Sequence, residues 1–373
     1  MRVAFHIDQL WFKAPGGIGT YVRELVQALE REDPSLELEL FRSTWDRAPA
    51  GIWPRDRAPV ELPRRIATLY PSWDLFGRPA LPDELASCDV VHATNHAAIA
   101  PAGRGQKLVV TVHDLAFERF PSAFPRNWRW LFRAGVRAAV RRADAILTPS
   151  RSTAEDLLSR SRVDPSKLHV VPLAASLEVG ADDPEAVLDR LRVRRPYVLF
   201  VGTLEPRKNV VRLVRAYRRL ASGGSPHSLV LAGPLGWGSE PLLRELKLSG
   251  SGEVVMTGAL TPEELDAMYR GADAFCYPSL YEGFGLPVIE AMARGVPTVA
   301  SSTSSIPEVA GDAALLVDPL NVRDISDALQ RVLGSPELAG DLSRRGRAQS
   351  ERFSWDESAR GTLRVYEHVM GAK

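Results

Sequence analysis

The chain has 373 residues, which is long for one hydrophobic core and favours two domains of ordinary size. Its 47 basic and 46 acidic residues leave a net charge of +1, which argues against a general nucleic-acid-binding protein. No apolar run is long enough to span a bilayer, and the two cysteines, Cys88 and Cys276, are spaced for neither a zinc site nor a redox motif. The first residues predict a buried strand and contain no secretory cleavage pattern, so we expect a cytoplasmic protein.

Short apolar runs alternate with helical patterns along the chain. The first series of predicted strands covers residues 3–7, 36–41, 90–92, 108–112 and 145–148. The second covers residues 197–202, 228–232, 254–257, 274–277 and 298–301. Such alternation predicts parallel sheets covered by helices, and two series predict two doubly wound α/β domains. Open sheets of this kind bind ligands at the carboxyl ends of their strands, so two facing domains would enclose a cleft. We place the linker within residues 174–195.

A glycine-rich segment, from Ala14 to Thr20, follows the first predicted strand and precedes an amphipathic helical pattern. Glycines at such a place let the backbone approach a phosphate group, and Gly16 and Gly17 are the candidates. The spacing is not the G-x-G-x-x-G of nicotinamide-binding proteins, and no G-x-x-x-x-G-K-[ST] of an NTPase occurs. Taken alone, the segment is also explained by a plain tight turn.

Between the second and third predicted strands the periodic pattern lapses, over residues 43–85. This stretch is rich in proline, arginine and tryptophan, and includes Trp45, Trp53 and Trp73. A loop of this length inside a compact domain is usually functional or disordered. A ligand-binding segment and a surface loop anchored by its aromatic residues are both open interpretations.

Three histidines lie at the ends of predicted strands. His92 and His96 belong to the third strand and its loop, and His113 ends the fourth, followed by Asp114. A single histidine at a strand end is most often structural, but its neutral ring can also orient a ligand hydroxyl.

A basic amphipathic helix is predicted between Pro125 and Asp144. Its apolar face carries Trp128 and Phe132, and another face carries Arg126, Arg129, Arg133, Arg137 and Arg141. Such a helix is compatible with peripheral membrane contact. It is equally compatible with an ordinary domain helix whose arginines point to solvent.

The second series opens with Thr203-Leu204-Glu205-Pro206-Arg207-Lys208-Asn209, directly after a buried strand. Two adjacent cations at a strand end can neutralise a diphosphate, because Arg207 offers a bidentate fork and Lys208 a point charge.

The segment from Ser279 to Ser301 contains two carboxylates, Glu282 and Glu290, eight positions apart across a glycine-containing turn. Proline is tolerated in the first turn of a helix, so the turn is expected to lead into a helix whose N-terminus can receive an anion. Carboxylates accept hydrogen bonds from hydroxyl groups. Anion site and carboxylates together predict a ligand with both phosphate and sugar, that is, a sugar nucleotide.

These segments together resemble the retaining glycosyltransferases of family 4, with their E-x7-E segment, G-x-L-x-x-x-K-N pattern and H-D pair. The resemblance implies the GT-B fold of two facing Rossmann-like domains: residues 1–175 on the acceptor side, residues 190–352 on the sugar-donor side, and a C-terminal helix, residues 353–373, that returns to the first domain. The catalytic residues it implies are His113, Arg207, Lys208 and Glu282. The residues it implies for binding the sugar nucleotide are Gly16, Gly17, Thr203, Arg207, Lys208, Ala259, Leu260, Glu282, Gly283, Phe284, Gly285, Leu286 and Glu290.

In this family the cations stabilise the leaving diphosphate, Glu290 holds the ribose, and Glu282 and His113 meet the transferred sugar. The chain has no Asp-x-Asp motif, so we expect no metal or other cofactor. The Glu-Pro before the cations resembles mannosyltransferases, which implies GDP-mannose as sugar donor and a glycan or lipid-linked glycan as acceptor in bacterial cell-surface polysaccharide synthesis. UDP-glucose or another UDP-sugar stays open. A non-transferring epimerase, a phosphorylase and a catalytically silent sugar-nucleotide-binding protein are the rival functions.

Overall fold

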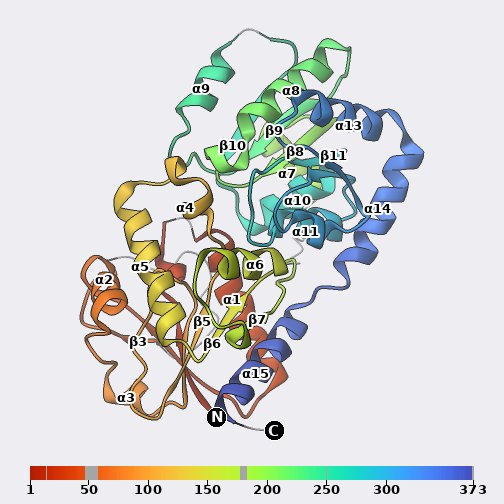
Figure 1. Ribbon diagram of the computed structural model, residues 1–373. Helices are drawn as coiled ribbons and strands as arrows, with labels where there is room; N and C mark the ends of the chain where they lie inside the picture. Colours follow the sequence, from red (N-terminus) through yellow and green to blue (C-terminus); the bar gives the residue numbers. More distant parts are fainter. Residues whose placement is uncertain (14, 47–57, 177–182, 249, 372–373) are drawn as a thin grey trace. The chain divides into compact units, whose positions relative to one another are not determined.

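The computed structural model describes residues 1–13, 15–46, 58–176, 183–248 and 250–371 (Figure 1). The chain forms two compact units. Unit 1 comprises Met1–Leu173 together with Ser354–Lys373, and unit 2 comprises Ala174–Phe353. Each unit is built around its own parallel sheet.

The described part of unit 1 contains a seven-stranded sheet with the order β3-β2-β1-β4-β5-β6-β7, in which every neighbouring pair is parallel. The strands are β1 (Arg2–His6), β2 (Glu37–Arg42), β3 (Val60–Glu61), β4 (Val90–Ala93), β5 (Lys107–Thr111), β6 (Ala145–Thr148) and β7 (Leu168–Val170). The order reverses between β1 and β4. Such a switch point opens a crevice at the carboxyl ends of the strands, where doubly wound sheets bind ligands.

The helices of unit 1 connect these strands, except for the last one, which follows unit 2 in the chain. They are α1 (Gly16–Glu32), α2 (Ile66–Phe76), α3 (Asp83–Ala86), α4 (Ala116–Arg119), α5 (Arg126–Arg142), α6 (Arg151–Arg160) and α15 (Trp355–Met370), with 3-10 turns η1 (Asp8–Trp11), η2 (Pro121–Ala123) and η3 (Pro165–Lys167). Serine caps start two of them: Ser150 accepts from the Thr153 amide and Ser354 from the Glu357 amide.

The last helix, α15, is an integral part of unit 1. Arg31 of α1 donates to Asp356 at 2.7 Å, and Arg360 donates to Glu32 at 2.9 Å. These pairs are exposed and contribute little to stability. Burial of the α15 residues Trp355 and Tyr366, which are 7% and 0% exposed, contributes more.

Unit 2 repeats the topology. Its described residues form a six-stranded parallel sheet with the order β10-β9-β8-β11-β12-β13, and the switch point lies between β8 and β11. The strands are β8 (Tyr197–Val201), β9 (Ser228–Ala232), β10 (Val254–Gly258), β11 (Ala274–Tyr277), β12 (Thr298–Ser301) and β13 (Ala314–Val317). Two parallel doubly wound sheets confirm the predicted α/β fold class.

The helices of unit 2 are α7 (Pro184–Arg190), α8 (Val210–Ser222), α9 (Glu240–Lys247), α10 (Pro262–Gly271), α11 (Leu286–Ala293), α12 (Ile306–Ala310), α13 (Val322–Gly334) and α14 (Pro336–Ser350), with the 3-10 turn η4 (Pro206–Lys208). The start of α10 shows why these sequences form helices where they do. Thr261 and Glu264 make a reciprocal capping box around Pro262, so two free amides are satisfied at the first turn.

The prediction of a loop over residues 43–85 is wrong for much of that stretch. It contains β3, α2 and α3, and Trp73 of α2 is a core residue with 1% of its surface exposed. Pro71 lies inside α2, where proline normally breaks a helix, and this hid the helical pattern. Trp53 lies outside the described residues.

Candidate active site

The switch point of unit 2 joins two loops that are about 70 residues apart in sequence: one follows β8 and the other follows β11. Asn209 ties them together, because its side-chain amide donates to the carbonyl of Pro278 at 2.9 Å and to that of Pro319 at 2.6 Å. Asn209 is 3% exposed and adopts a left-handed backbone conformation, with φ of 61°, which asparagine tolerates better than most residues. The Leu280 amide also donates to the Arg207 carbonyl at 2.9 Å.

The two predicted cations and one predicted carboxylate meet between these loops. Arg207 Nη1 lies 2.9 Å from Glu282 Oε2, and Lys208 Nζ lies 2.7 Å from Glu282 Oε1. Arg207 also pairs with Glu205 at 2.8 Å. The four side chains are 9–13% exposed and their formal charges cancel. The cluster is therefore a neutral, preformed set of charges rather than a pair of solvated cations.

Glu282 is ionised in this cluster. Burial opposes its ionisation, but Arg207 and Lys208 outweigh burial and lower the pKa of Glu282 to about 2. Ser279 and Tyr277 also donate to Glu282 Oε1. Burial and the neighbouring Arg207 lower the pKa of Lys208, and Glu282 partly offsets this.

The segment after Glu282 leads into α11. Gly285 precedes the helix with φ of 115°, and a Cβ there would lie 2.6 Å from Ile306 Cδ1, so only glycine fits. Pro287 has no amide proton, and the Val288 and Ile289 amides donate to the Gly285 carbonyl at 2.9 and 3.4 Å, so the Leu286 amide is the donor that this helix start offers to an anion. Glu290 lies on this helix and accepts a hydrogen bond from Tyr269 at 2.9 Å.

The other predicted residues of unit 2 lie at the same edge of the sheet. Thr203 follows β8, and Gly283, Phe284 and Leu286 belong to the segment that leads into α11. Ala259 and Leu260 follow β10, which is two strands away from β8.

Gly16 and Gly17 form the first turn of α1, which begins earlier than the amphipathic pattern indicated. Gly16 has φ of 59°, and no atom lies within 4 Å of the position that a Cβ would take. The amides of this first turn have no intrahelical acceptor, so they are suited to an anionic group.

His113 has a defined tautomer. Its Nε2 lies 2.9 Å from the Thr94 carbonyl oxygen, which only accepts, so Nε2 carries the proton and Nδ1 is a hydrogen-bond acceptor. Burial lowers the pKa of His113, which keeps the ring neutral. Asp114 accepts from the Ala116 amide at 2.8 Å and caps the next turn, so the carbonyl of Thr94, not Asp114, sets the tautomer.

The two other histidines differ from each other. His92 is 0% exposed and bonds through both ring nitrogens, to Tyr366 at 2.6 Å and to Thr111 at 2.8 Å, so it is structural. His96 stacks on Phe117, and its buried ring nitrogens have no hydrogen-bond partner in the part of unit 1 that the structure describes. Burial lowers the pKa of His96 to about 4.

A polar cluster at the carboxyl end of β1 was not found from the sequence. Asp8 accepts from the Ser43 amide and hydroxyl, both at 2.7 Å, and from Tyr70 at 2.9 Å and Trp45 at 3.0 Å. His6 Nε2 lies 3.0 Å from Asp8. Burial opposes ionisation of Asp8, but these partners lower its pKa to about 2. The cluster holds the β1 and β2 ends of unit 1 together.

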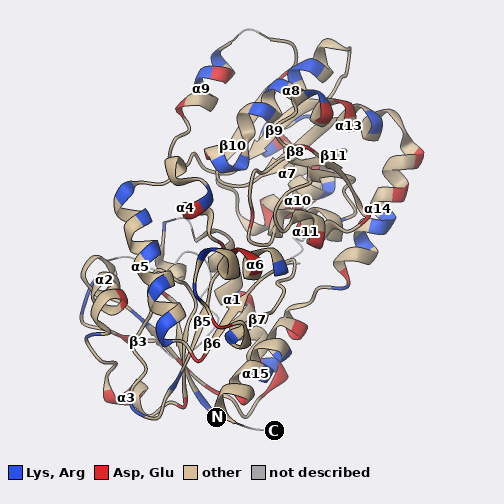
Figure 2. Ribbon diagram, viewed as in Figure 1, with Lys and Arg blue, Asp and Glu red and all other residues tan. Residues whose placement is uncertain are grey.

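The exposed face of α5 is basic. Arg126, Trp130, Arg137 and Arg141 are exposed and fall on one side of the helix, and Figure 2 shows the basic residues along it. Trp130 is 51% exposed. Among the described residues, no helix is long and apolar enough to cross a bilayer, and no three His, Cys, Asp or Glu side chains are grouped to hold a metal ion.

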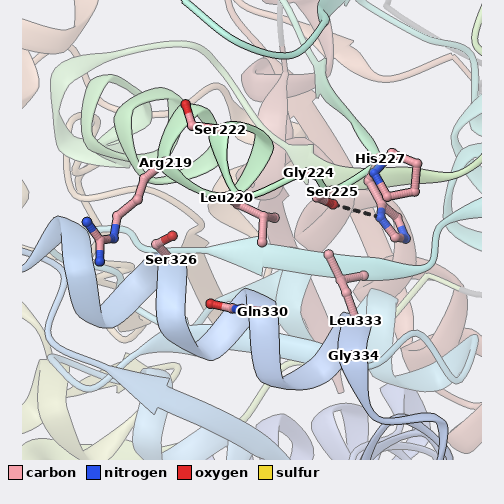
Figure 3. A pocket seen from close by; sticks show the side chains of 12 residues that line it. Arg219, Leu220, Ser222, Gly224, Ser225, His227, Ser326, Gln330, Leu333 and Gly334 are labelled. Carbon is pink, nitrogen blue, oxygen red and sulfur yellow. Dashed lines mark hydrogen bonds between the residues drawn. The ribbon is translucent and has the colours of Figure 1, made fainter.

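A pocket of about 730 Å³ opens between α8 and α13 (Figure 3). Its side chains include Arg219, Leu220, His227, Ser326 and Gln330. The pocket lies near the C-terminal end of α8, whereas the cations directly precede the N-terminal end of that helix. None of the predicted site residues lines this pocket, so it is separate from the cation cluster.

Comparison with known proteins identifies the family. Residues 15–179 match the model "Glycosyltransferase Family 4", and residues 189–349 match "Glycosyl transferases group 1". The chain is 31% identical to the MMP alpha-(1->4)-mannosyltransferase of Mycolicibacterium hassiacum over 95% of both chains. It is 32% identical to the O-antigen chain mannosyltransferase B of Escherichia coli over 71% of both.

Solved structures agree in fold over the full length. Sucrose-phosphate synthase from Thermosynechococcus elongatus has a TM-score of 0.75 at 22% identity and covers 100% of both chains. WaaG, a glycosyltransferase of lipopolysaccharide biosynthesis, has a TM-score of 0.72 at 14% identity, covering 99% of this chain and 100% of WaaG. Anabaena HepE in complex with UDP and glucose has a TM-score of 0.71 at 16% identity, covering 100% of this chain and 98% of HepE. The chain belongs to glycosyltransferase family 4 and is a hexosyltransferase with the GT-B fold.

Proposed function

We propose that this glycosyltransferase transfers mannose from GDP-mannose, with retention at the anomeric carbon, to a glycan or lipid-linked glycan acceptor in cell-surface polysaccharide synthesis. The observation that carries the proposal is the cluster of Arg207, Lys208 and Glu282 at the switch point of unit 2. Two cations beside the N-terminus of α11 suit a diphosphate, and carboxylates beside them suit hydroxyl groups.

In this proposal the chemistry is electrostatic. As the bond from the sugar to the nucleoside diphosphate breaks, negative charge builds on the leaving phosphate. Arg207, Lys208 and the Leu286 amide at the start of α11 stabilise that charge, and the partners of the two cations already hold both side chains in place. The cations supply the positive charge, so the mechanism needs no divalent ion.

Three side chains accept hydrogen bonds from the sugar nucleotide. Glu290 accepts from the ribose hydroxyls and Glu282 from a hydroxyl of the transferred sugar. His113 accepts through Nδ1, since Nε2 is committed to the Thr94 carbonyl. Because all three groups accept, the ligand groups opposite them must donate, which hydroxyls do.

The nucleotide is the first testable feature. Support for mannose as the transferred sugar comes from relatives named mannosyltransferases, while HepE was solved with UDP and glucose. We expect GDP at about 100 times its Kd to raise the Tm by about 5–10 °C, and UDP and ADP to raise it less. Transfer from GDP-mannose should then proceed in buffer with EDTA. A larger shift with UDP, and transfer from a UDP-sugar, would contradict the mannose assignment.

For the acceptor, we propose that unit 1 meets a lipid-linked glycan at the cytoplasmic face of an anionic membrane. Trp130 and Arg137 share the exposed face of α5, and Phe76, 73% exposed, ends the neighbouring α2. Gly77 adjoins Arg142 of α5, because a Cβ at Gly77 would lie 2.9 Å from Arg142 Nη1. An apolar residue beside such a basic face suits an interfacial helix.

Vesicle flotation tests this contact. We expect the protein to float with vesicles containing anionic phospholipid and to stay in solution with neutral vesicles, and Arg137→Glu with Arg141→Glu should abolish flotation. The same double reversal at Arg344 and Arg345 of α14 is the control and should leave flotation intact. Equal flotation of wild type and the α5 variant would refute a role for α5.

A further inference from the structure

Two buried tyrosines each place a hydroxyl on one carboxylate of the Glu282–Glu290 pair. Tyr277 ends β11, and its hydroxyl lies 3.0 Å from Glu282 Oε1. Tyr269 lies on α10, and its hydroxyl lies 2.9 Å from Glu290 Oε2. Both side chains are 0% exposed. No motif in the sequence pointed to either tyrosine.

Tyr277 bridges the cation and the carboxylate. The ammonium of Lys208 carries only donors, so it donates to the Tyr277 oxygen at 2.6 Å. The single proton of Tyr277 is then directed to Glu282. Burial and the negative charge of Glu282 raise the pKa of Tyr277 well above its ordinary value, so this proton stays in place.

The ring of Tyr269 is held in place by an arginine. The guanidinium of Arg294 lies 5.2 Å from the Tyr269 ring centroid, and Arg294 is itself fixed by Asp266 at 2.8 Å. Asp266 is 1% exposed. A side chain whose ring is pinned in this way keeps its hydroxyl in one place, and the partner carboxylate of Glu290 loses rotational freedom with it.

Both tyrosines pack in one row of aromatic rings. The ring of Phe275 lies 5.7 Å from that of Tyr269 and 5.8 Å from that of Tyr277, and Phe200 of β8 stacks on Tyr277 at 5.7 Å. Closely packed rings resist displacement, since the interior has few voids. The spacing between the two hydroxyls is therefore set by the core of unit 2.

We propose that Tyr277 and Tyr269 are positioning residues of the transferase site: Tyr277 aligns Lys208 and Glu282 for the leaving diphosphate and the transferred sugar, and Tyr269 aligns Glu290 for the ribose. The proposal rests on the function proposed above. It predicts that the two hydroxyls affect different kinetic constants, because one serves the transition state and the other serves ground-state binding.

Tyrosine-to-phenylalanine variants test this division. Loss of a hydrogen bond to a charged group changes a rate or binding constant by roughly 10- to 100-fold. Tyr277→Phe should therefore lower kcat by about that factor with little change in KM. The alkaline limb of the pH profile of kcat should also move to lower pH in this variant. The reason is that the Lys208 ammonium loses an acceptor, which lowers the pKa of Lys208. Tyr269→Phe should weaken nucleoside diphosphate binding about 5- to 10-fold, measured by calorimetry, and leave kcat within about twofold.

Tyr217 supplies the matched control. It is also 0% exposed in unit 2, but its hydroxyl donates to the His227 carbonyl, away from the cations. Tyr217→Phe should lower stability without changing kcat, KM or nucleotide affinity. If all three variants show the same kinetic constants as wild type, or if Tyr217→Phe reproduces the effects of the others, the positioning role is refuted.

A structural measurement separates this proposal from the proposed function. Crystal structures of the three variants should show Glu282 displaced only in Tyr277→Phe and Glu290 displaced only in Tyr269→Phe. Unmoved carboxylates would overturn the positioning role whatever the enzyme transfers. A wild-type protein that transfers no sugar from any nucleotide sugar would instead overturn the proposed function, and displaced carboxylates would still support the tyrosine assignment.

Discussion

Replacing Lys208 with methionine, which keeps most of the stem and removes the charge, is expected to lower kcat by about 10²–10³-fold. The physical reason is that Lys208 meets a charge that grows as the leaving group departs, so its loss costs more in the transition state than in the bound substrate. Nucleotide affinity should change much less. Arg207→Ala should have a similar effect, because Arg207 holds the other oxygen of Glu282.

Steady-state kinetics together with calorimetry for the nucleotide checks this expectation. Arg219→Ala, at the far end of α8 and half exposed, is the control and should retain full turnover. If Lys208→Met and Arg207→Ala both turn over at the wild-type rate, leaving-group stabilisation by these cations is wrong. If they lose affinity and turnover in proportion, the cations serve uniform binding instead.

Raising the pH from about 4 to about 8 is expected to destabilise wild type relative to Asp74→Asn by on the order of 5 kcal/mol. Asp74 of α2 is 1% exposed, and burial raises its pKa from 3.8 to about 8, against the opposing effects of the Ile99 amide and Arg142. The folded protein thus keeps a proton that the unfolded chain has released. The stability that protonated Asp74 contributes is fully present below about pH 4 and is lost as the pH rises through 8.

The surroundings of Asp74 explain why asparagine should be tolerated. Oδ1 accepts from the Ile99 amide at 2.9 Å, while Oδ2 has no hydrogen-bond partner among the described residues. A Cβ at Gly135 would lie 3.1 Å from Oδ2 and 1.7 Å from the His96 carbonyl oxygen, so an acceptor is near Oδ2. A protonated carboxyl and an amide both offer a donor there, whereas a carboxylate does not.

Denaturant unfolding of wild type and Asp74→Asn at several pH values between 4 and 9 measures the effect, because other titrating groups cancel in the comparison. Glu155→Gln, on the exposed side of α6, is the control and should follow the wild-type profile. Parallel profiles for wild type and Asp74→Asn would show that Asp74 titrates normally in the folded protein.

The fold was largely accessible from the sequence. The predicted strands at β6, β9, β11 and β12 match the observed bounds, and the six others of the two series agree within one residue at each end. Strands in the middle of a parallel sheet are buried on both faces, so they leave continuous apolar runs. The edge strands β3 and β7 were missed because a charged or polar residue interrupts each of them, and β13 was missed although Ala314–Val317 is a continuous apolar run.

The features of the site fall into two groups: those that depend on neighbours in sequence and those that depend on contacts between distant segments. The sequence by itself determined the two α/β units, the adjacent cations Arg207 and Lys208, and the glycine-containing turn between Glu282 and Glu290, because each depends on neighbours within a few positions. Only the tertiary structure decided that Glu282 neutralises those cations, that Asn209 joins the two loops, and that buried tyrosines hold both carboxylates. Contacts between strands β8 and β11 depend on the sheet order, which brings side chains more than 70 residues apart within hydrogen-bond distance and which no local pattern encodes.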